Sequence, residues 1–313
     1  MLKVGFVTND LSRSKGLITG LDSLGDMTIN VVIASPNVAK DVLHYDLGRA
    51  HQQSDLMLFD GLHSATMLYS ALGSAKPFVI RAMGPEILVP EFMKLNWGKL
   101  KGLSIPSPYY GNNVWPKLKA KLGTNTIAKI SSIPATVNSS EISYHPNYKN
   151  SQAVMFHHLA PEYSLFPLVA FLKNNPTYSI SVVGSPMGPY DNLLRAECVA
   201  QDVDPSRLEI LSELKTEILE DFAQDRPFIL SVRPDESVFH HVREFITYGC
   251  VPVIQESPIS REMFPECVHD ISQVKLDEEY PVDGRLEKAN TTKTLITNEE
   301  SQKVAELLRE VSA

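Results

Sequence analysis

The chain has 313 residues, of which 43% are hydrophobic and 21% are charged, with a net charge of −8. This length suits two domains better than one, and the composition excludes a disordered or fibrous protein. No apolar run approaches the roughly 18 residues of a membrane-spanning helix, and the N-terminus reads as a strand rather than a signal peptide. The three cysteines lack metal-ligand spacing, which predicts a reducing, cytoplasmic location.

Short apolar runs in the first half of the chain predict a parallel β-sheet. The predicted strands are residues 2–8, 29–34, 56–59, 78–81, 103–106 and 128–133. A loop at residues 9–16 ends at Gly16 and leads into a helix at residues 17–24. Asp60, His63 and Arg81 lie at or just after strand ends, where ligands bind in open α/β sheets.

A lysine-rich segment, residues 92–140, contains no Asp or Glu. Its lysines are Lys94, Lys99, Lys101, Lys117, Lys119, Lys121 and Lys129, and both tryptophans of the chain, Trp97 and Trp115, lie among them. A basic surface interleaved with aromatic rings attracts a polyanion, either nucleic acid or an anionic membrane face. The alternative is a lysine-coated helical surface whose charge serves solubility.

A second series of strands and helices follows a polar linker at residues 138–152. The predicted strands are residues 153–156, 179–183, 208–211, 228–232 and 251–254, and the predicted helices are residues 193–199, 217–222, 238–248 and 299–311. The charge changes with this boundary. Residues 1–140 hold 14 Lys and Arg against 9 Asp and Glu, whereas residues 141–313 hold 15 against 28. We therefore expect two doubly wound α/β domains facing one cleft, at residues 1–145 and 146–313.

The most informative stretch is residues 234–255, which read PDESVFHHVREFITYGCVPVIQ. Glu236 falls in the loop after a predicted strand, and Glu244 lies about two turns along the following helix. A step of eight residues turns both carboxylates to nearly the same side. The adjacent His240 and His241 splay apart along a helix, so we expect no metal site there.

This stretch resembles the donor-binding E-x7-E motif of retaining glycosyltransferases of family 4, which have the GT-B fold. By that resemblance Glu244 binds the ribose hydroxyls of a nucleotide sugar and Glu236 contacts the donor sugar. A carboxylate suits this role because it accepts two hydrogen bonds from a vicinal diol. The chain departs from the pattern in having Pro252 eight residues after Glu244 rather than seven.

The resemblance also assigns roles to residues outside this stretch. His157 and His158 occupy the place of the family's Gly-Arg pair, and Tyr163 that of its lysine, so His157, His158 and Arg233 are the candidates to hold the donor diphosphate. Gly184 and Gly16 are the glycines expected to let the backbone approach the donor. Asp60 and His63 are the catalytic candidates of the first domain. The acceptor-binding candidates are Arg81, Lys94, Lys99, Lys101, Lys117 and Lys119.

The resemblance thus implies a hexosyl- or pentosyltransferase that retains anomeric configuration, takes a nucleotide-diphosphate sugar (a UDP-sugar by default) as donor and needs no cofactor. A basic first domain fits an acidic acceptor: a modified base in DNA, or a glycan or lipid-linked glycan at a membrane that the protein contacts peripherally. Two alternatives stay open, a sugar-nucleotide epimerase of the same architecture and a sugar-nucleotide-binding pseudoenzyme or partner protein. The departures at His158 and Tyr163 favour the pseudoenzyme, and the presence of both Glu236 and Glu244 favours the enzyme.

Overall fold

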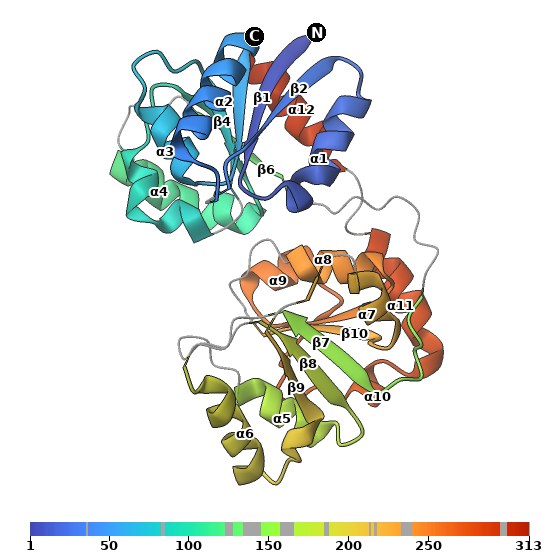
Figure 1. Ribbon diagram of the computed structural model, residues 1–313. Helices are drawn as coiled ribbons and strands as arrows, with labels where there is room; N and C mark the ends of the chain where they lie inside the picture. Colours follow the sequence, from blue (N-terminus) through green and yellow to red (C-terminus); the bar gives the residue numbers. More distant parts are fainter. Residues whose placement is uncertain are drawn as a thin grey trace. The chain divides into compact units, whose positions relative to one another are not determined.

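The computed structural model describes residues 1–35, 37–82, 85–122, 128–133, 145–156, 166–184, 188–212, 214–215, 218–232, 240–294 and 299–312. The chain divides into two compact units: Met1–Asn138 together with Thr297–Ala313 (unit 1), and Ser139–Ile296 (unit 2). Each unit is built on a six-stranded parallel sheet with helices around it (Figure 1). The predicted fold class of two Rossmann-like α/β domains is confirmed.

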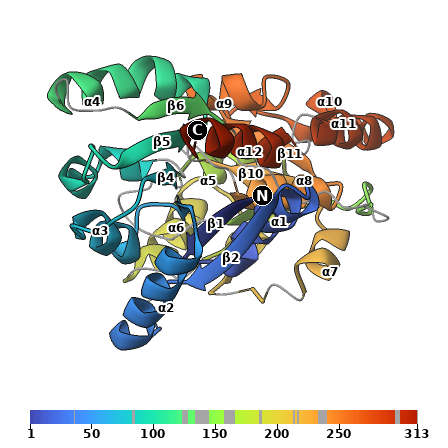
Figure 2. The ribbon, with the colours of Figure 1, turned by 90° about the horizontal axis from the view of Figure 1, so that it is seen from above.

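The sheet of unit 1 has the strand order β2-β1-β3-β4-β5-β6, and Figure 2 labels β2, β1, β4, β5 and β6 of this sheet. Its strands are β1 (Leu2–Thr8), β2 (Met27–Ile33), β3 (Leu56–Asp60), β4 (Phe78–Arg81), β5 (Leu100–Ile105) and β6 (Lys129–Ser132). Its helices are α1 (Leu11–Ser23), α2 (Lys40–Gln53), α3 (Ser64–Ala71), α4 (Trp115–Leu122) and α12 (Glu299–Ser312), with shorter turns η1 (Pro85–Leu88), η2 (Pro90–Lys94) and η3 (Tyr110–Val114). The chain winds outward from β1 to β2 and then reverses to β3. The switch point, where ligands bind in such sheets, therefore lies between β1 and β3.

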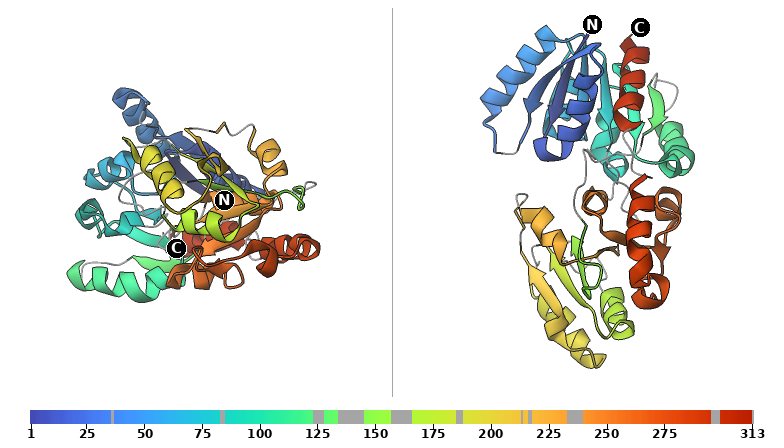
Figure 3. Two further views of the ribbon diagram at one scale, coloured as in Figure 1. Left: turned by 90° about the horizontal axis from the view of Figure 1, so that it is seen from below. Right: turned by 90° about the vertical axis from the view of Figure 1, so that its right-hand side faces the viewer.

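Helix α12 belongs to unit 1, although it follows unit 2 in the sequence. Its apolar residues share a buried cluster with Val4 and Phe6 of β1; they are Val304, Ala305, Leu307 and Leu308. Gly20 of α1 permits this approach, because an added Cβ would lie 2.7 Å from Cβ of Ser301. Figure 3 (right) shows the red α12 beside the strands of unit 1.

The predicted division into residues 1–145 and 146–313 is therefore corrected. Unit 2 begins at Ser139, and residues 297–313 return to unit 1. The physical reason is that the apolar stripe of α12 is buried in the core of unit 1, where it also places a carboxylate beside the sheet.

The sheet of unit 2 has the strand order β12-β11-β10-β7-β8-β9. Its strands are β7 (Gln152–Phe156), β8 (Ser179–Val183), β9 (Leu208–Leu211), β10 (Phe228–Ser231), β11 (Val251–Gln255) and β12 (Val268–His269). Its helices are α5 (Phe166–Asn174), α6 (Tyr190–Ala200), α7 (Leu219–Gln224), α8 (His240–Thr247), α9 (Pro258–Met263), α10 (Leu276–Glu279) and α11 (Val282–Thr294), with the short turn η5 (Pro205–Arg207). The winding reverses between β7 and β10, which are hydrogen-bonded neighbours. The switch point of unit 2 thus lies where Phe156 and Ser231 end their strands.

Candidate functional site

Helix α8 follows β10 and carries Glu244 in unit 2. The helix buries Val242, Phe245 and Ile246, which are 3%, 0% and 0% exposed, and it packs against β10 and β11. This apolar face fixes the rotation of α8 about its axis. Glu244 lies on another side of the helix, and its side chain keeps 16% of its surface exposed.

Two side chains, His241 and Tyr248, lie beside the Glu244 carboxylate, and the ring of Phe156 supports the first of them. The Nδ1 atom of His241 lies 3.6 Å from Oε2 of Glu244. The His241 ring stacks on Phe156, with ring centroids 4.3 Å apart and an interplanar angle of 19°. One turn beyond Glu244, burial and the nearby Glu244 carboxylate raise the pKa of Tyr248 to about 12. Glu244 is therefore a partly buried acid whose surroundings restrict where its carboxylate can lie.

Most of the other residues predicted to bind the donor cannot be placed. His157, His158, Arg233 and Glu236 lie outside the described residues. Gly184 directly follows β8, and its N–H donates to the carbonyl of Leu211 at 2.7 Å. This bond continues the pairing of β8 with β9, so the structure gives Gly184 a role in the sheet.

The carboxyl ends of three strands in unit 1 carry a buried polar network. Thr8, Asp60 and Arg81 are in register across β1, β3 and β4. The guanidinium of Arg81 donates to the carboxylate of Asp60, and its Nε donates to Oε1 of Glu300 on α12 at 2.5 Å. The hydroxyl of Ser14 donates to the other oxygen of Asp60. Asp60, Arg81 and Glu300 are 0%, 3% and 1% exposed.

The network places Asp60 and Arg81 in the interior of unit 1, and their predicted catalytic and acceptor-binding roles stay predictions. Burial alone lowers the pKa of Arg81, but the carboxylates of Glu300 and Asp60 outweigh it and hold that pKa above its ordinary value. The network holds β3, β4 and α12 together, because each of these elements contributes one of its charged residues.

His63 occupies a different position at the same edge of the sheet. It is the N-cap residue of α3, and its backbone N–H donates to Oγ1 of Thr66 at 3.3 Å. Its Nδ1 atom lies 3.4 Å from the same oxygen. The side chain is half-buried. Of the catalytic candidates in unit 1, His63 is the one that keeps an exposed surface.

The sequence predicted that Gly16 ends a loop, but the structure places it in a helix. Helix α1 begins at Leu11, and the N–H of Ser14 already donates to the carbonyl of Asp10 at 3.2 Å. Ser14 also bonds Asp10 and Asp60 through its hydroxyl, which ties the first turn of the helix to β3. Gly16 is therefore inside the helix.

The predicted acceptor lysines do not gather at one edge of the sheet. Lys99 precedes β5 at the amino-terminal edge, where its Nζ donates to the carbonyl of Gly73 at 2.6 Å, and Lys101 is the second residue of that strand. Lys94 lies in η2, 4.0 Å from Glu91, with 68% of its side chain exposed.

Lys117 and Lys119 lie on α4, which follows the carboxyl end of β5, and both are exposed. Trp97 and Trp115, in contrast, are 7% and 8% exposed and pack together with ring centroids 5.8 Å apart. The expectation of a basic surface interleaved with these tryptophans is therefore wrong, because both rings belong to the core.

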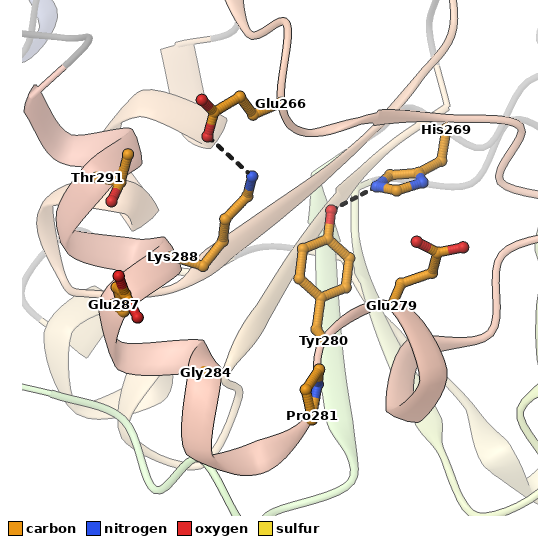
Figure 4. A pocket seen from close by; sticks show the side chains of 9 residues that line it. All are labelled: Glu266, His269, Glu279, Tyr280, Pro281, Gly284, Glu287, Lys288 and Thr291. Carbon is orange, nitrogen blue, oxygen red and sulfur yellow. Dashed lines mark hydrogen bonds and ion pairs between the residues drawn. The ribbon is translucent and has the colours of Figure 1, made fainter.

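Unit 2 contains a cavity of about 410 Å³ between β12, α10 and α11 (Figure 4). In its wall, Lys288 pairs with Glu266 at 3.1 Å, and the Nε2 atom of His269 lies 2.5 Å from the hydroxyl of Tyr280. Burial lowers the pKa of His269 and raises that of Tyr280. None of these residues was predicted from the sequence to be functional.

The part of the chain that the structure describes lacks both a metal-ligand cluster and a membrane-spanning helix. No group of three or more His, Cys, Asp or Glu there is arranged to hold a metal ion. No helix among the same residues combines the length and apolar character needed to cross a membrane.

The whole chain resembles solved structures of glycosyltransferases. AviGT4, a glycosyltransferase involved in avilamycin A biosynthesis, matches with a TM-score of 0.64 and 12% identity over 100% of this chain and 99% of that one. Anabaena Alr3699/HepE, solved in complex with UDP and glucose, matches with a TM-score of 0.67 and 14% identity over 99% of this chain and 100% of that one. Sucrose-phosphate synthase (tll1590) from Thermosynechococcus elongatus matches with a TM-score of 0.60 and 10% identity over 99% of each chain.

No protein-family model matches the sequence, and a search of curated proteins finds no match. At identities of 10–14% the structural likeness shows the fold. That fold is the pair of Rossmann-like domains found in glycosyltransferases of the GT-B class.

Proposed function

We propose that the protein is a glycosyltransferase that takes a sugar from a nucleotide-diphosphate sugar and passes it to an acceptor. The observation that carries the proposal is the position of Glu244. It is a partly buried carboxylate on the helix that follows β10, next to the switch point of unit 2. The fold, shared with glycosyltransferases of which one was solved with UDP and glucose, supports a UDP-sugar as the donor.

In this proposal the two oxygens of Glu244 accept hydrogen bonds from the ribose diol of the donor, which fixes the nucleotide. Glu236 positions the donor sugar. As the glycosidic bond breaks, negative charge grows on the leaving diphosphate, and His157, His158 and Arg233 are the groups that would stabilise it. The anomeric configuration is retained, as the resemblance of the motif implies.

The acceptor in this proposal is anionic and contacts unit 1 through α4. Lys117 and Lys119 are exposed on this helix, and the segment around them contains no acidic residue. Because Trp97 and Trp115 are buried, charge rather than stacking on these rings would hold the acceptor. This favours an anionic glycan or lipid-linked glycan over a nucleobase in DNA, and His63 is then the proposed catalytic group of unit 1.

The test is release of nucleoside diphosphate from a panel of UDP-, GDP- and other nucleotide sugars. Each donor is assayed without acceptor, with oligosaccharides, with anionic glycolipid vesicles and with duplex DNA. Glu244→Gln is the inactivating variant. Glu278→Gln, whose side chain is 71% exposed on α10, is the matched control.

Acceptor-dependent release that is lost in Glu244→Gln and kept in Glu278→Gln establishes a transferase and identifies its donor. Conversion of the donor sugar without any acceptor identifies an epimerase instead. Donor binding without turnover makes the protein a nucleotide-sugar-binding pseudoenzyme. Absence of both binding and release for every donor contradicts the proposal.

A further inference from the structure

The side chain of His241 connects the sheet of unit 2 to the Glu244 carboxylate. Phe156 is the last residue of β7, and its ring packs against Phe245 at 5.1 Å between centroids. The His241 ring lies nearly parallel on Phe156, 4.3 Å away. Its Nδ1 atom lies 3.6 Å from Glu244, which is an ion-pair distance rather than that of a short hydrogen bond.

We propose that His241 is a positioning residue that holds the Glu244 carboxylate in the orientation that binds the ribose of a nucleotide sugar. The inference rests on the proposed function of Glu244 and deepens it. A glutamate has several rotatable bonds and samples several rotamers unless neighbours restrict it. His241 one turn before Glu244 and Tyr248 one turn after it lie on the same side of α8, so the carboxylate is confined from both directions.

The stack on Phe156 explains why a histidine is suited to this position. The ring contact fixes the imidazole plane, and a fixed plane directs Nδ1 toward Glu244. A flexible side chain such as lysine has no ring to stack on Phe156 at the end of β7, so its donor atom would not be held in one place. The Glu244 carboxylate is therefore ordered before the donor arrives, which reduces the entropy lost when the donor binds.

The interaction acts on donor binding and not on the reacting bond. Ordering one long side chain in advance corresponds to about a three- to tenfold gain in affinity. We therefore expect loss of the His241 nitrogen to raise KM for the donor by about three- to tenfold and to change kcat by less than about twofold.

The experiment uses the full-length protein and the nucleotide sugar that the panel identifies as donor. His241→Phe keeps a ring on Phe156 and removes the nitrogens. His241→Asn restores an N–H near the position of Nδ1 without the ring. Glu244→Gln and the double variant His241→Phe/Glu244→Gln complete a cycle, and melting temperatures check that each variant folds. Because the side chains of His241 and Glu244 are 47% and 16% exposed, so that neither is fully buried, we expect all of them to fold.

The inference predicts a raised donor KM in His241→Phe, a partial recovery in His241→Asn, whose N–H lacks the ring that stacks on Phe156, and a double variant no worse than Glu244→Gln alone. A wild-type KM in His241→Phe overturns it and shows that only ring packing matters. Additive losses in the double variant also overturn it, because the two residues then act independently. A wild-type protein that neither binds nor turns over any nucleotide sugar overturns the proposed function, and the inference with it.

Discussion

Replacing Arg81 with methionine takes a cation away from two buried carboxylates. Asp60 and Glu300 are 0% and 1% exposed, and Arg81 donates to both. Methionine fills most of the volume of the arginine stem, so the change removes charge more than it removes packing. The carboxylates come from β3 and α12, and the loss therefore acts on the attachment of α12 to unit 1.

The expected loss is large because an uncompensated buried charge cannot be solvated. Breaking a buried ion pair by removing one partner costs about 3–5 kcal/mol. Domains are typically stable by about 5–15 kcal/mol, so the variant would lose about a fifth or more of that stability. With a urea m-value of about 2–3 kcal/mol/M, the urea midpoint for unit 1 falls by about 1–2.5 M.

The assay is urea denaturation followed by far-UV circular dichroism, with two comparisons. Arg49→Met removes an exposed arginine that pairs with Asp46 at 3.3 Å, and we expect a loss below about 1 kcal/mol. The triple variant Asp60→Asn/Arg81→Met/Glu300→Gln removes all three charges and is expected to regain part of the lost stability. The reasoning is refuted if Arg81→Met costs no more than Arg49→Met, or if the triple variant is less stable than Arg81→Met alone.

Three further predictions concern packing, pH and charge. Gly20→Ala forces α1 away from α12 and is expected to destabilise unit 1 by about 1–3 kcal/mol. Gly48→Ala on α2, where an added Cβ meets nothing within 4 Å, should instead stabilise unit 1 by up to about 1 kcal/mol. Equal melting temperatures for the two variants would contradict the α1–α12 contact. Burial lowers the pKa of His269 below its ordinary value of 6.5, so the unfolded state binds more protons below that pH and stability falls as the pH drops through about 6.5. The melting temperature of His269→Gln should therefore fall less between pH 7.5 and pH 5.5 than that of the wild type, and an identical fall in both would argue against this linkage. Lys117→Glu/Lys119→Glu should raise the KM for an anionic acceptor and make that KM less dependent on salt, while the donor KM stays unchanged. Steady-state assays at two salt concentrations measure both constants. An unchanged acceptor KM would exclude α4 from the acceptor site.

Much of the fold follows from local sequence patterns. Strands buried on both faces read as largely apolar runs, so β1 and β8 were predicted with the bounds that the structure shows. The helix that carries Glu244 was predicted from the spacing of Val242, Phe245 and Ile246, and all three are buried. The sequence therefore placed Glu244 correctly on the helix after β10.

Features that depend on distant contacts could not be predicted in the same way. An amphipathic stripe predicts that α12 buries one face but not which core receives it, and that core belongs to unit 1. Arg81 and Glu300 are 219 positions apart, and no local pattern indicates that they pair. A tryptophan among lysines can lie inside or outside the protein, and Trp97 and Trp115 prove to be inside.

The measurement that tests the central claim most directly is calorimetric titration of UDP into the wild-type protein and into Glu244→Gln. Loss of hydrogen bonds to a charged group costs about 1.5–3 kcal/mol, so we expect UDP to bind the wild type and to bind Glu244→Gln about 10- to 100-fold more weakly. Equal affinities in the two proteins, with both folded, would contradict the assignment of Glu244 as the ribose-binding residue. No binding to the wild type, with GDP and other nucleoside diphosphates equally inert, would contradict a nucleotide-sugar site altogether.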